Sequence, residues 1–393
     1  MEKNTDNMSI QKDFLWLILF LIVFINGFEA GGYQASLWNI GQHYDLSVTT
    51  MGLFASVELF ATMLAPLILG SWADRTSKAK SISILLLLQF IAAFIILLTN
   101  ASELFIFGVF FLGLTTSALQ FISIAALADA YPVSGNRKIG YITSMYALGA
   151  LVSPLVVSFY LSKGMSWRTL FALLSLGSLV SLIGINKSRN QLKDHIIVEE
   201  QNSPTGNNQS SFMIGGILLL CVIMCIYVGF ENGFTFFVDT LFKDTLNSDL
   251  GKYALSLYWA VMIPSRVFSG HFASKAKNIL ITAIISIPVV TIILANCNSS
   301  ILVLLLCIPL GLASGAIYPC VLNTMFPLAG KKTATATGMI TTATGIGGVV
   351  FTALTGFLGD YFGLNIAMII ISIFFIISLN CAILAFKIGD KNY

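Results

Sequence analysis

Long apolar stretches alternate with short polar ones along the whole chain. Twelve apolar runs occur among the 393 residues. A helix of about 20 residues spans the ~30 Å hydrocarbon core of a bilayer, so each run predicts one transmembrane helix. The runs cover residues 14–38, 50–72, 81–99, 104–131, 139–161, 167–185, 212–242, 251–273, 279–296, 301–326, 333–357 and 364–386. The pattern therefore predicts an all-α membrane protein with twelve transmembrane helices.

One polar stretch is much longer than the others. It lies between the sixth and seventh runs, at residues 186–211, and contains charged side chains followed by Ser203-Pro204-Thr205-Gly206. This composition is typical of a linker. It predicts an N-terminal six-helix bundle over residues 1–185 and a C-terminal six-helix bundle over residues 212–393.

The two halves repeat one another. Gly27-Phe28-Glu29 in the first run recurs as Gly229-Phe230-Glu231 in the seventh. At almost the same offset, Gly70-Ser71-Trp72-Ala73 aligns with Gly270-His271-Phe272-Ala273. The repeat predicts two pseudo-symmetric, parallel halves with a substrate site at their interface near the middle of the membrane, as in one large class of transporters.

Basic residues predict the orientation. Loops on the cytoplasmic side of a membrane carry the excess of Lys and Arg. The loops after the second, fourth, eighth and tenth runs hold Arg75, Lys78, Lys80, Arg137, Lys138, Lys275, Lys277, Lys331 and Lys332. We therefore expect a multi-pass protein of the cell inner membrane, with a cytoplasmic linker and both termini in the cytoplasm.

Composition narrows the function classes. The chain is 56% hydrophobic and only 10% charged, whereas soluble domains average about 25% charged residues. The net charge is +3. The sequence has no stripe of basic residues of the kind that would predict a nucleic-acid partner. No phosphate-binding loop, metal-ligand cluster or nucleophile triad is present, so we expect no enzyme activity, metal or cofactor. The expected partners are a small-molecule substrate and the lipid bilayer, and the expected state is a monomer.

Three carboxylates lie inside apolar runs, at Glu29, Glu58 and Glu231. A charge at a helix centre costs roughly 2.5–3.5 kcal/mol on insertion scales, so such residues are functional by default. Each is a candidate proton carrier, because a carboxyl group in a low dielectric can be neutral in one access state and charged in another; Na⁺ is the alternative coupling ion. The other interpretation is a hydrogen-bonded Glu that only holds helices together. Asp239, near the end of its run, is expected to be solvated.

The first carboxylate lies on a polar stripe. Asn26, Glu29, Tyr33 and Gln34 fall on one helix face. The positions around Glu231 are mostly apolar, so we expect Glu29 to be the more solute-exposed of the two. Amide, hydroxyl and aromatic groups in the presumed pathway suit a polar organic solute. The candidate ligands are Asn26, Tyr33, Gln34, Gln120, Tyr146, Tyr227, Asn232, Tyr258, Trp259, Tyr318 and Asn323.

Several motifs resemble those of the major facilitator superfamily. Gly70-Ser71-Trp72-Ala73-Asp74-Arg75, with Lys78 and Lys80, resembles its signature between helices 2 and 3, although Ser77 replaces a usual Gly. Trp167-Arg168 is similar to its start of helix 6. The resemblance implies twelve helices working by alternating access. It also implies a cytoplasmic gate, for which Gly70, Asp74, Arg75 and Arg266 are the candidates.

A narrower resemblance is to the fucose/proton-symporter group of that superfamily. Tyr227-Val228-Gly229-Phe230-Glu231 is similar to its helix 7 motif, and Tyr258-Trp259 and Tyr318-Pro319 agree with its helices 8 and 10. Glu29 stands nearest to the Asp of its first helix. This resemblance implies proton-coupled import of a small polar solute such as a sugar.

The fifth run keeps an alternative open. Gly149-Ala150-Leu151-Val152-Ser153-Pro154 partly resembles the antiporter signature of drug exporters. It favours a proton-coupled antiporter that exports a drug, siderophore or metabolite, although small residues also permit close helix packing. A third reading, a membrane receptor or scaffold that transports nothing, does not account for the intramembrane acids.

Overall fold

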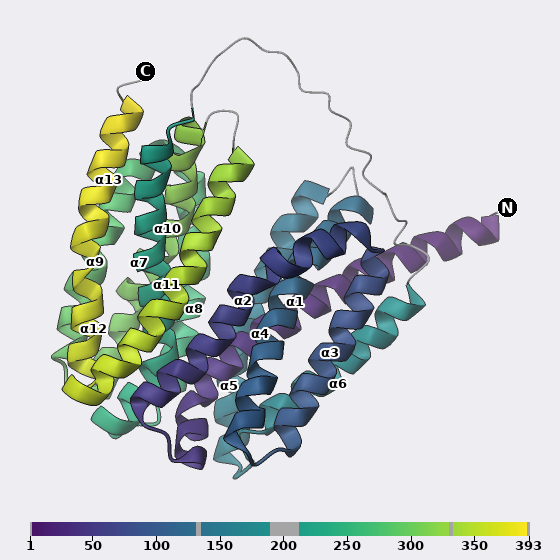
Figure 1. Ribbon diagram of the computed structural model, residues 1–393, viewed down its shortest axis with the longest axis horizontal. Coiled ribbons are helices and arrows are strands. Elements are labelled where there is room, and N and C mark those ends of the chain that lie inside the picture. Colours follow the sequence, from purple (N-terminus) through teal and green to yellow (C-terminus); the bar gives the residue numbers. More distant parts are fainter. Residues whose placement is uncertain (1, 131–134, 189–211, 330–332, 391–393) are drawn as a thin grey trace. The chain divides into compact units, whose positions relative to one another are not determined.

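A computed structural model describes residues 2–130, 135–188, 212–329 and 333–390 (Figure 1). Within these ranges the chain forms helices and no strand. The helices are α1 (Glu2–Tyr44), α2 (Val48–Arg75), α3 (Lys78–Leu98), α4 (Ser102–Ala130), α5 (Gly135–Ser162), α6 (Thr169–Lys187), α7 (Ile214–Thr240), α8 (Gly251–His271), α9 (Ala276–Ala295), α10 (Ser300–Ala329), α11 (Thr333–Phe362), α12 (Leu364–Ile373) and α13 (Phe375–Asp390). A π-helical turn, η2 (Leu241–Thr245), extends α7, and a 3-10 turn, η3 (Ala273–Lys275), precedes α9. The predicted all-α class is confirmed.

Eleven of the described helical segments are long and apolar enough to span a membrane. α12 and α13 together make one of them, Leu364–Gly389. α8 is not among the eleven, because Lys252 and Arg266 lower its mean hydropathy, yet it packs along α10 as a full member of its bundle. With α8, the described helices match the twelve apolar runs of the sequence.

The helices group into two compact units. The first comprises Met1–Tyr33 and Val57–Ser203. In it, α3 packs against both α4 and α6. Its core is aliphatic and includes the buried side chains of Leu19, Ile82, Ile122 and Ile185, one from each of α1, α3, α4 and α6. The predicted linker lies almost entirely outside the described residues.

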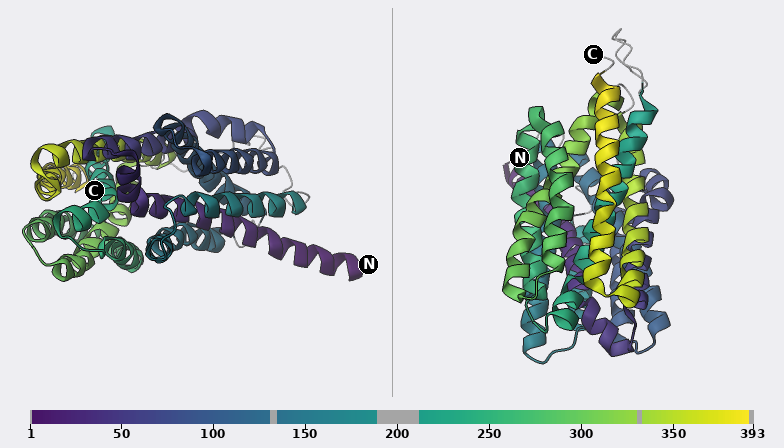
Figure 2. Two further views of the ribbon diagram at one scale, coloured as in Figure 1. Left: turned by 90° about the horizontal axis from the view of Figure 1, so that it is seen from below. Right: turned by 90° about the vertical axis from the view of Figure 1, so that its left-hand side faces the viewer.

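The second unit comprises Gln34–Ser56 and Pro204–Tyr393. In it, α7 packs against α11 and α13, and α10 packs against α8 and α9; Figure 2 shows these helices running side by side. The unit also contains the end of α1 and the start of α2. Asp360, at the end of α11, accepts hydrogen bonds from the backbone N–H groups of Val48 and Thr49, each at 2.8 Å, and so caps the N-terminus of α2. Helices α1 and α2 therefore contribute to both units.

Glycines repeat the same packing role in the two halves. In the first unit, a Cβ on Gly149 of α5 would lie 2.2 Å from the carbonyl oxygen of Phe24 in α1. In the second, a Cβ on Gly347 of α11 would lie 2.0 Å from the carbonyl oxygen of Cys225 in α7. Backbones meet directly at both places, and only glycine fits. The small residues around Gly149 thus have a packing role, whatever the direction of transport.

Replacing Gly347 with alanine is expected to destabilise the protein by about 1–3 kcal/mol, because backbone must move to accept the methyl group. Gly338 is the matched control in the same helix, since a Cβ there meets nothing within 4 Å. Gly338→Ala should leave stability unchanged or raise it slightly through better helix propensity. The measurement is the thermal midpoint of each purified variant in one detergent. Equal midpoints for the two variants would contradict the close approach of α7 and α11.

Candidate functional site

Polar side chains from four helices meet inside the first unit. Asn26 of α1 donates to the backbone carbonyl of Thr116 in α4 at 3.0 Å. Gln89 of α3 donates to Asn26 Oδ1 at 3.1 Å and to the Thr116 hydroxyl at 3.3 Å, and it accepts from the hydroxyl of Ser178 in α6 at 2.9 Å. The Thr116 hydroxyl in turn donates to Glu29 Oε2 at 3.3 Å. Buried polar groups need such partners, and this network fixes the Glu29 carboxyl group within the bundle.

A second carboxyl group belongs to the same unit. Glu58 of α2 is 5% exposed, and its Oε2 has no hydrogen-bond partner among the described residues. It interacts electrostatically with Glu29. None of the ion pairs in the described part of the chain includes either carboxyl group. Two like charges repel strongly in a low dielectric, so this carboxyl pair is suited to hold at least one proton.

The expected difference in exposure between the two repeated glutamates is wrong. Glu29 is 1% exposed, whereas the Glu231 side chain is 12% exposed. The polar stripe of α1 does share one face, but Asn26 and Glu29 bond to α4, and Tyr33 packs beside Phe105 with ring centres 6.4 Å apart. Asn26, Glu29 and Tyr33 therefore face neighbouring helices of the first unit, where Asn26 and Glu29 have hydrogen-bond partners.

The second unit pairs its intramembrane acid with a cation. Arg266 Nη2 of α8 lies 4.0 Å from Glu231 Oε2 of α7, and the Arg266 side chain is 40% exposed. Tyr227, one turn before Glu231, and Tyr258 of α8 both interact electrostatically with this carboxylate. The Tyr258 ring also packs against Phe234 at a centroid distance of 5.2 Å. A charged pair is thus surrounded by aromatic side chains with polar tips.

Polar atoms without a regular hydrogen bond gather around that pair. Buried side-chain polar atoms usually have at least one hydrogen-bond partner, but several here have none at ordinary geometry among the described residues. The atoms that form no hydrogen bond of ordinary geometry are Tyr227 Oη, Glu231 Oε2, Tyr258 Oη, Trp259 Nε1, Arg266 Nε and Ser314 Oγ, from α7, α8 and α10. Among them, Tyr227 lies beside Glu231 and Tyr258 lies beside Ser314. Hydrogen-bond donors and hydrogen-bond acceptors are therefore both available to water or to a polar solute. Together they form a candidate solute site in the described part of the second unit.

The other predicted ligands are dispersed. Asn232 donates to the carbonyl of Val228 in its own helix at 3.0 Å, and Asn323 lines a separate cavity at the end of α10. Tyr318 is 37% exposed, and Gln34 is buried in the second unit. Gln120 and Tyr146 are partly buried in the first unit. Their roles as ligands stay predictions.

The predicted gate falls mostly outside the described side chains. Gly70, Asp74 and Arg75 belong to α2, but their side chains are not among those that the structure describes. The gate assignment for these three stays a prediction. Arg266 is described, and its ion pair with Glu231 places it in the polar cluster of the second unit.

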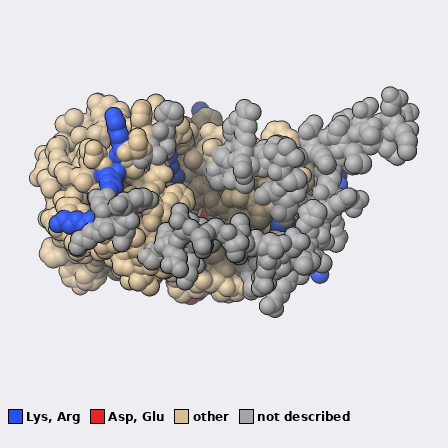
Figure 3. All heavy atoms as spheres, turned by 90° about the horizontal axis from the view of Figure 1, so that it is seen from above, with Lys and Arg blue, Asp and Glu red and all other residues tan. Residues whose placement is uncertain are grey.

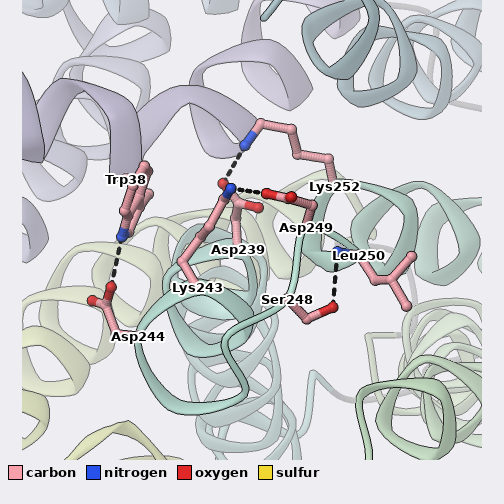
Figure 4. Close-up of polar contacts among 8 residues, drawn as sticks. All are labelled: Trp38, Asp239, Lys243, Asp244, Ser248, Asp249, Leu250 and Lys252. Atoms are coloured by element: carbon pink, nitrogen blue, oxygen red, sulfur yellow. Dashed lines mark hydrogen bonds and ion pairs between the residues drawn. The ribbon is translucent and has the colours of Figure 1, made fainter. Parts of the chain in front are cut away.

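Asp239 is buried, which corrects the expectation that it is solvated. Its side chain is 1% exposed and forms an ion pair with Lys252, which reaches it from the start of α8 (Figure 4). Near this end of α7, Trp38 donates to Asp244 at 2.8 Å, and Lys243 pairs with Asp249. Lys243 holds the pKa of the Asp249 carboxyl below its ordinary value. Asp239 and Lys252 compensate each other in the interior, so their charges do not need solvent.

Sequence reasoning missed four members of these clusters: Gln89, Thr116, Ser178 and Ser314. Gln89 could have been predicted as a member of a buried polar cluster, because it is the only amide in the apolar run 81–99 and intramembrane polar groups need partners. No sequence feature marks Thr116, Ser178 or Ser314, since Ser and Thr are common in transmembrane helices. Only their neighbours in the fold reveal their roles.

Two helical units with buried polar groups are an arrangement found in many secondary transporters. The sequence matches the Major Facilitator Superfamily across residues 19–352. The chain therefore belongs to that superfamily and is a multi-pass membrane transporter.

Known proteins resemble this chain at low sequence identity, one of them in sequence and two in structure. The chain is 23% identical to Multidrug resistance protein 2 of Bacillus subtilis (strain 168) over 330 residues, which cover 80% of this chain and 81% of that one. A bacterial homolog of the human lysosomal transporter Spinster, in an inward-facing and occupied conformation, has a TM-score of 0.78 at 14% identity, covering 95% of this chain and 97% of its own. The xylose transporter XylE from E. coli has a TM-score of 0.73 at 13% identity, covering 96% and 97%.

Proposed function

We propose that this chain is a proton-coupled transporter that imports a small polar organic solute, with a sugar-like compound as the first candidate. It works by alternating access as a monomer in the cell inner membrane, with both termini in the cytoplasm. A proton is the coupling ion, and no cofactor takes part. The Lys and Arg distribution along the sequence supports the orientation.

One observation carries the solute class. The cluster of Tyr227, Glu231, Tyr258, Trp259 and Arg266 presents buried donors and acceptors that form no hydrogen bond of ordinary geometry within the described chain. A solute with several hydroxyl or carbonyl groups pairs with them, while an apolar solute leaves each one unpaired at a cost of about 1–3 kcal/mol. The aromatic rings supply flat apolar faces for a solute with a ring.

The first unit binds the proton and the second unit binds the solute. In the first, Glu29 and Glu58 lack a cation partner in the described structure, so a proton is what neutralises their charge. In the second, Arg266 already compensates Glu231, which leaves this pair free to orient a solute. Proton binding and solute binding are then linked because each stabilises one access state over the other.

Export is the second candidate, and one comparison favours it. The relative from Bacillus subtilis is called a multidrug resistance protein. An exporter with the same proton site would run as an antiporter. The charged and hydrogen-bonding character of the cluster around Glu231 weighs against a mainly apolar drug.

Transport into proteoliposomes tests the proposal. Vesicles containing the purified protein receive labelled sugars, polyols, nucleosides and a lipophilic cationic drug under an inward proton gradient, an inward Na⁺ gradient or neither. Accumulation of a polar solute under the proton gradient alone supports the proposal. Gradient-driven loss of preloaded drug, without uptake of any polar solute, would favour the exporter instead.

Tyr258→Phe is expected to raise the KM for that solute about five- to tenfold. The change removes one fully buried hydroxyl, which lies beside Ser314, and a hydrogen bond from it to the solute is worth about 1–1.5 kcal/mol. Tyr253→Phe is the control, because this tyrosine of the same helix is 47% exposed. Unchanged KM in both variants would remove Tyr258 from the solute site.

A further inference from the structure

The second unit contains a cavity that the transport proposal does not use. Its volume is about 400 Å³. It lies where η3 and the start of α9 meet the ends of α10 and α13. α7 also begins at this end, since the backbone N–H of Met213 donates to the carbonyl of Leu328 at 2.9 Å. Among its lining residues are Lys275, Lys277, Asn278, Asn323, Leu328 and Phe386.

The mouth of the cavity is basic. Lys275 and Lys277 are both exposed, and none of the described lining residues is an Asp or Glu. Figure 3 looks onto this end of the helices and shows Lys and Arg side chains together over the second unit. α9 starts between the two lysines, at Ala276, so the positive end of its dipole adds to their charge. Asn278 and Asn323 add neutral amide donors.

The opposite wall is apolar. Leu328 is 1% exposed and Phe386 is 9% exposed. Lys277 Nζ lies 5.5 Å from the centre of the Phe386 ring, which places the basic and apolar parts of the cavity side by side. Free phosphate needs only the basic part. A ligand that also carries hydrocarbon uses both.

We propose that this cavity binds a phosphate group, and that its source is the headgroup of an anionic phospholipid. Lys275 and Lys277 contact the phosphate oxygens, the amides of Asn278 and Asn323 donate to the headgroup, and the glycerol and first acyl carbons lie along Leu328 and Phe386. Basic pockets between transmembrane helices on the cytoplasmic side are suited to such headgroups. The cavity is formed within one unit, so binding there does not depend on the identity of the transported solute.

Lipid binding to the purified full-length protein tests the proposal. The delipidated protein in detergent is titrated with phosphatidylglycerol, with zwitterionic phosphatidylcholine, or with water-soluble glycerol phosphate, and bound lipid is counted by native mass spectrometry. We expect saturable binding of phosphatidylglycerol and at least tenfold weaker binding to the Lys275→Gln/Lys277→Gln variant. Lys275→Arg/Lys277→Arg should keep the affinity, because it keeps both charges.

A charge-matched control separates this cavity from general attraction. Lys78→Gln/Lys80→Gln removes two lysines at the start of α3 in the other unit and should leave phosphatidylglycerol binding unchanged. Equal loss in both double variants, or equal binding of phosphatidylcholine and phosphatidylglycerol, would overturn the proposal. Binding of glycerol phosphate with the same affinity and the same dependence on Lys275 and Lys277 would support the phosphate site but assign it to a soluble ligand.

Discussion

Exchanging Glu29 or Glu58 for glutamine is expected to abolish uphill transport while leaving solute exchange intact. For a one-to-one symporter, a gradient of one pH unit supplies about 1.4 kcal/mol and supports roughly tenfold accumulation. A glutamine cannot release or take up the proton, so this ratio should fall to about one. Exchange of labelled for unlabelled solute at equal concentrations needs no net proton movement and should persist.

The matched control for this experiment is Glu103→Gln. Glu103 lies in the first turn of α4, in the same unit, and is exposed. It should accumulate solute as the original chain does. Tenfold accumulation in both Glu29→Gln and Glu58→Gln would show that the coupling proton binds elsewhere. Loss of accumulation with retained exchange in only one of them would assign the proton to that residue alone.

Replacing Arg266 with methionine is expected to lower the rate of transport about ten- to a hundredfold, because a hydrogen bond to a charged group is worth about 1.5–3 kcal/mol. The change leaves the Glu231 carboxylate in a largely buried place without its cation. Breaking a buried ion pair costs about 3–5 kcal/mol, but the Arg266 side chain is 40% exposed, so solvent screening reduces the loss of stability to about 1–2 kcal/mol. Thermal midpoints and initial uptake rates measure the two effects separately.

The double variant Glu231→Gln/Arg266→Met distinguishes structure from function. It removes both charges, so its thermal midpoint should return close to the original value while transport stays lost. Lys163→Met, at an exposed lysine, is the control for a simple loss of positive charge. Full transport in the double variant would show that the pair only stabilises the bundle.

Much of the fold could be predicted because span length and charge are local properties. The apolar runs gave the helices, including α8, whose Lys252 and Arg266 lower its mean hydropathy. The repeated Gly-Phe-Glu tripeptide marked two of the three intramembrane acids, Glu29 and Glu231. The motif at Gly149 left export and close helix packing open; the structure shows that this glycine packs against the backbone of α1, and the export reading stays a prediction.

The candidate site was only partly predictable, and particular residues show why. Asn26 and Glu29 were correctly placed on one face of their helix, since helical spacing alone decides that. What that face contacts depends on Gln89, Thr116 and Ser178, which lie far away in the sequence. Asp239 was expected in solvent because it lies near a helix end, but Lys252 of the next helix neutralises it in the interior.

The sequence by itself determined that this protein is a twelve-helix transporter with acids inside its membrane spans. Hydropathy, basic loops and repeats can be recognised from the order of the residues alone, without knowledge of tertiary contacts. Only the tertiary structure decided how those acids differ. Glu29 and Glu58 share a unit without a cation partner in the described residues, and Glu231 lies beside Arg266. The reason is physical: the cost of a buried charge is set by what lies within a few ångströms of it, and neighbours at that distance come from helices that only folding brings together.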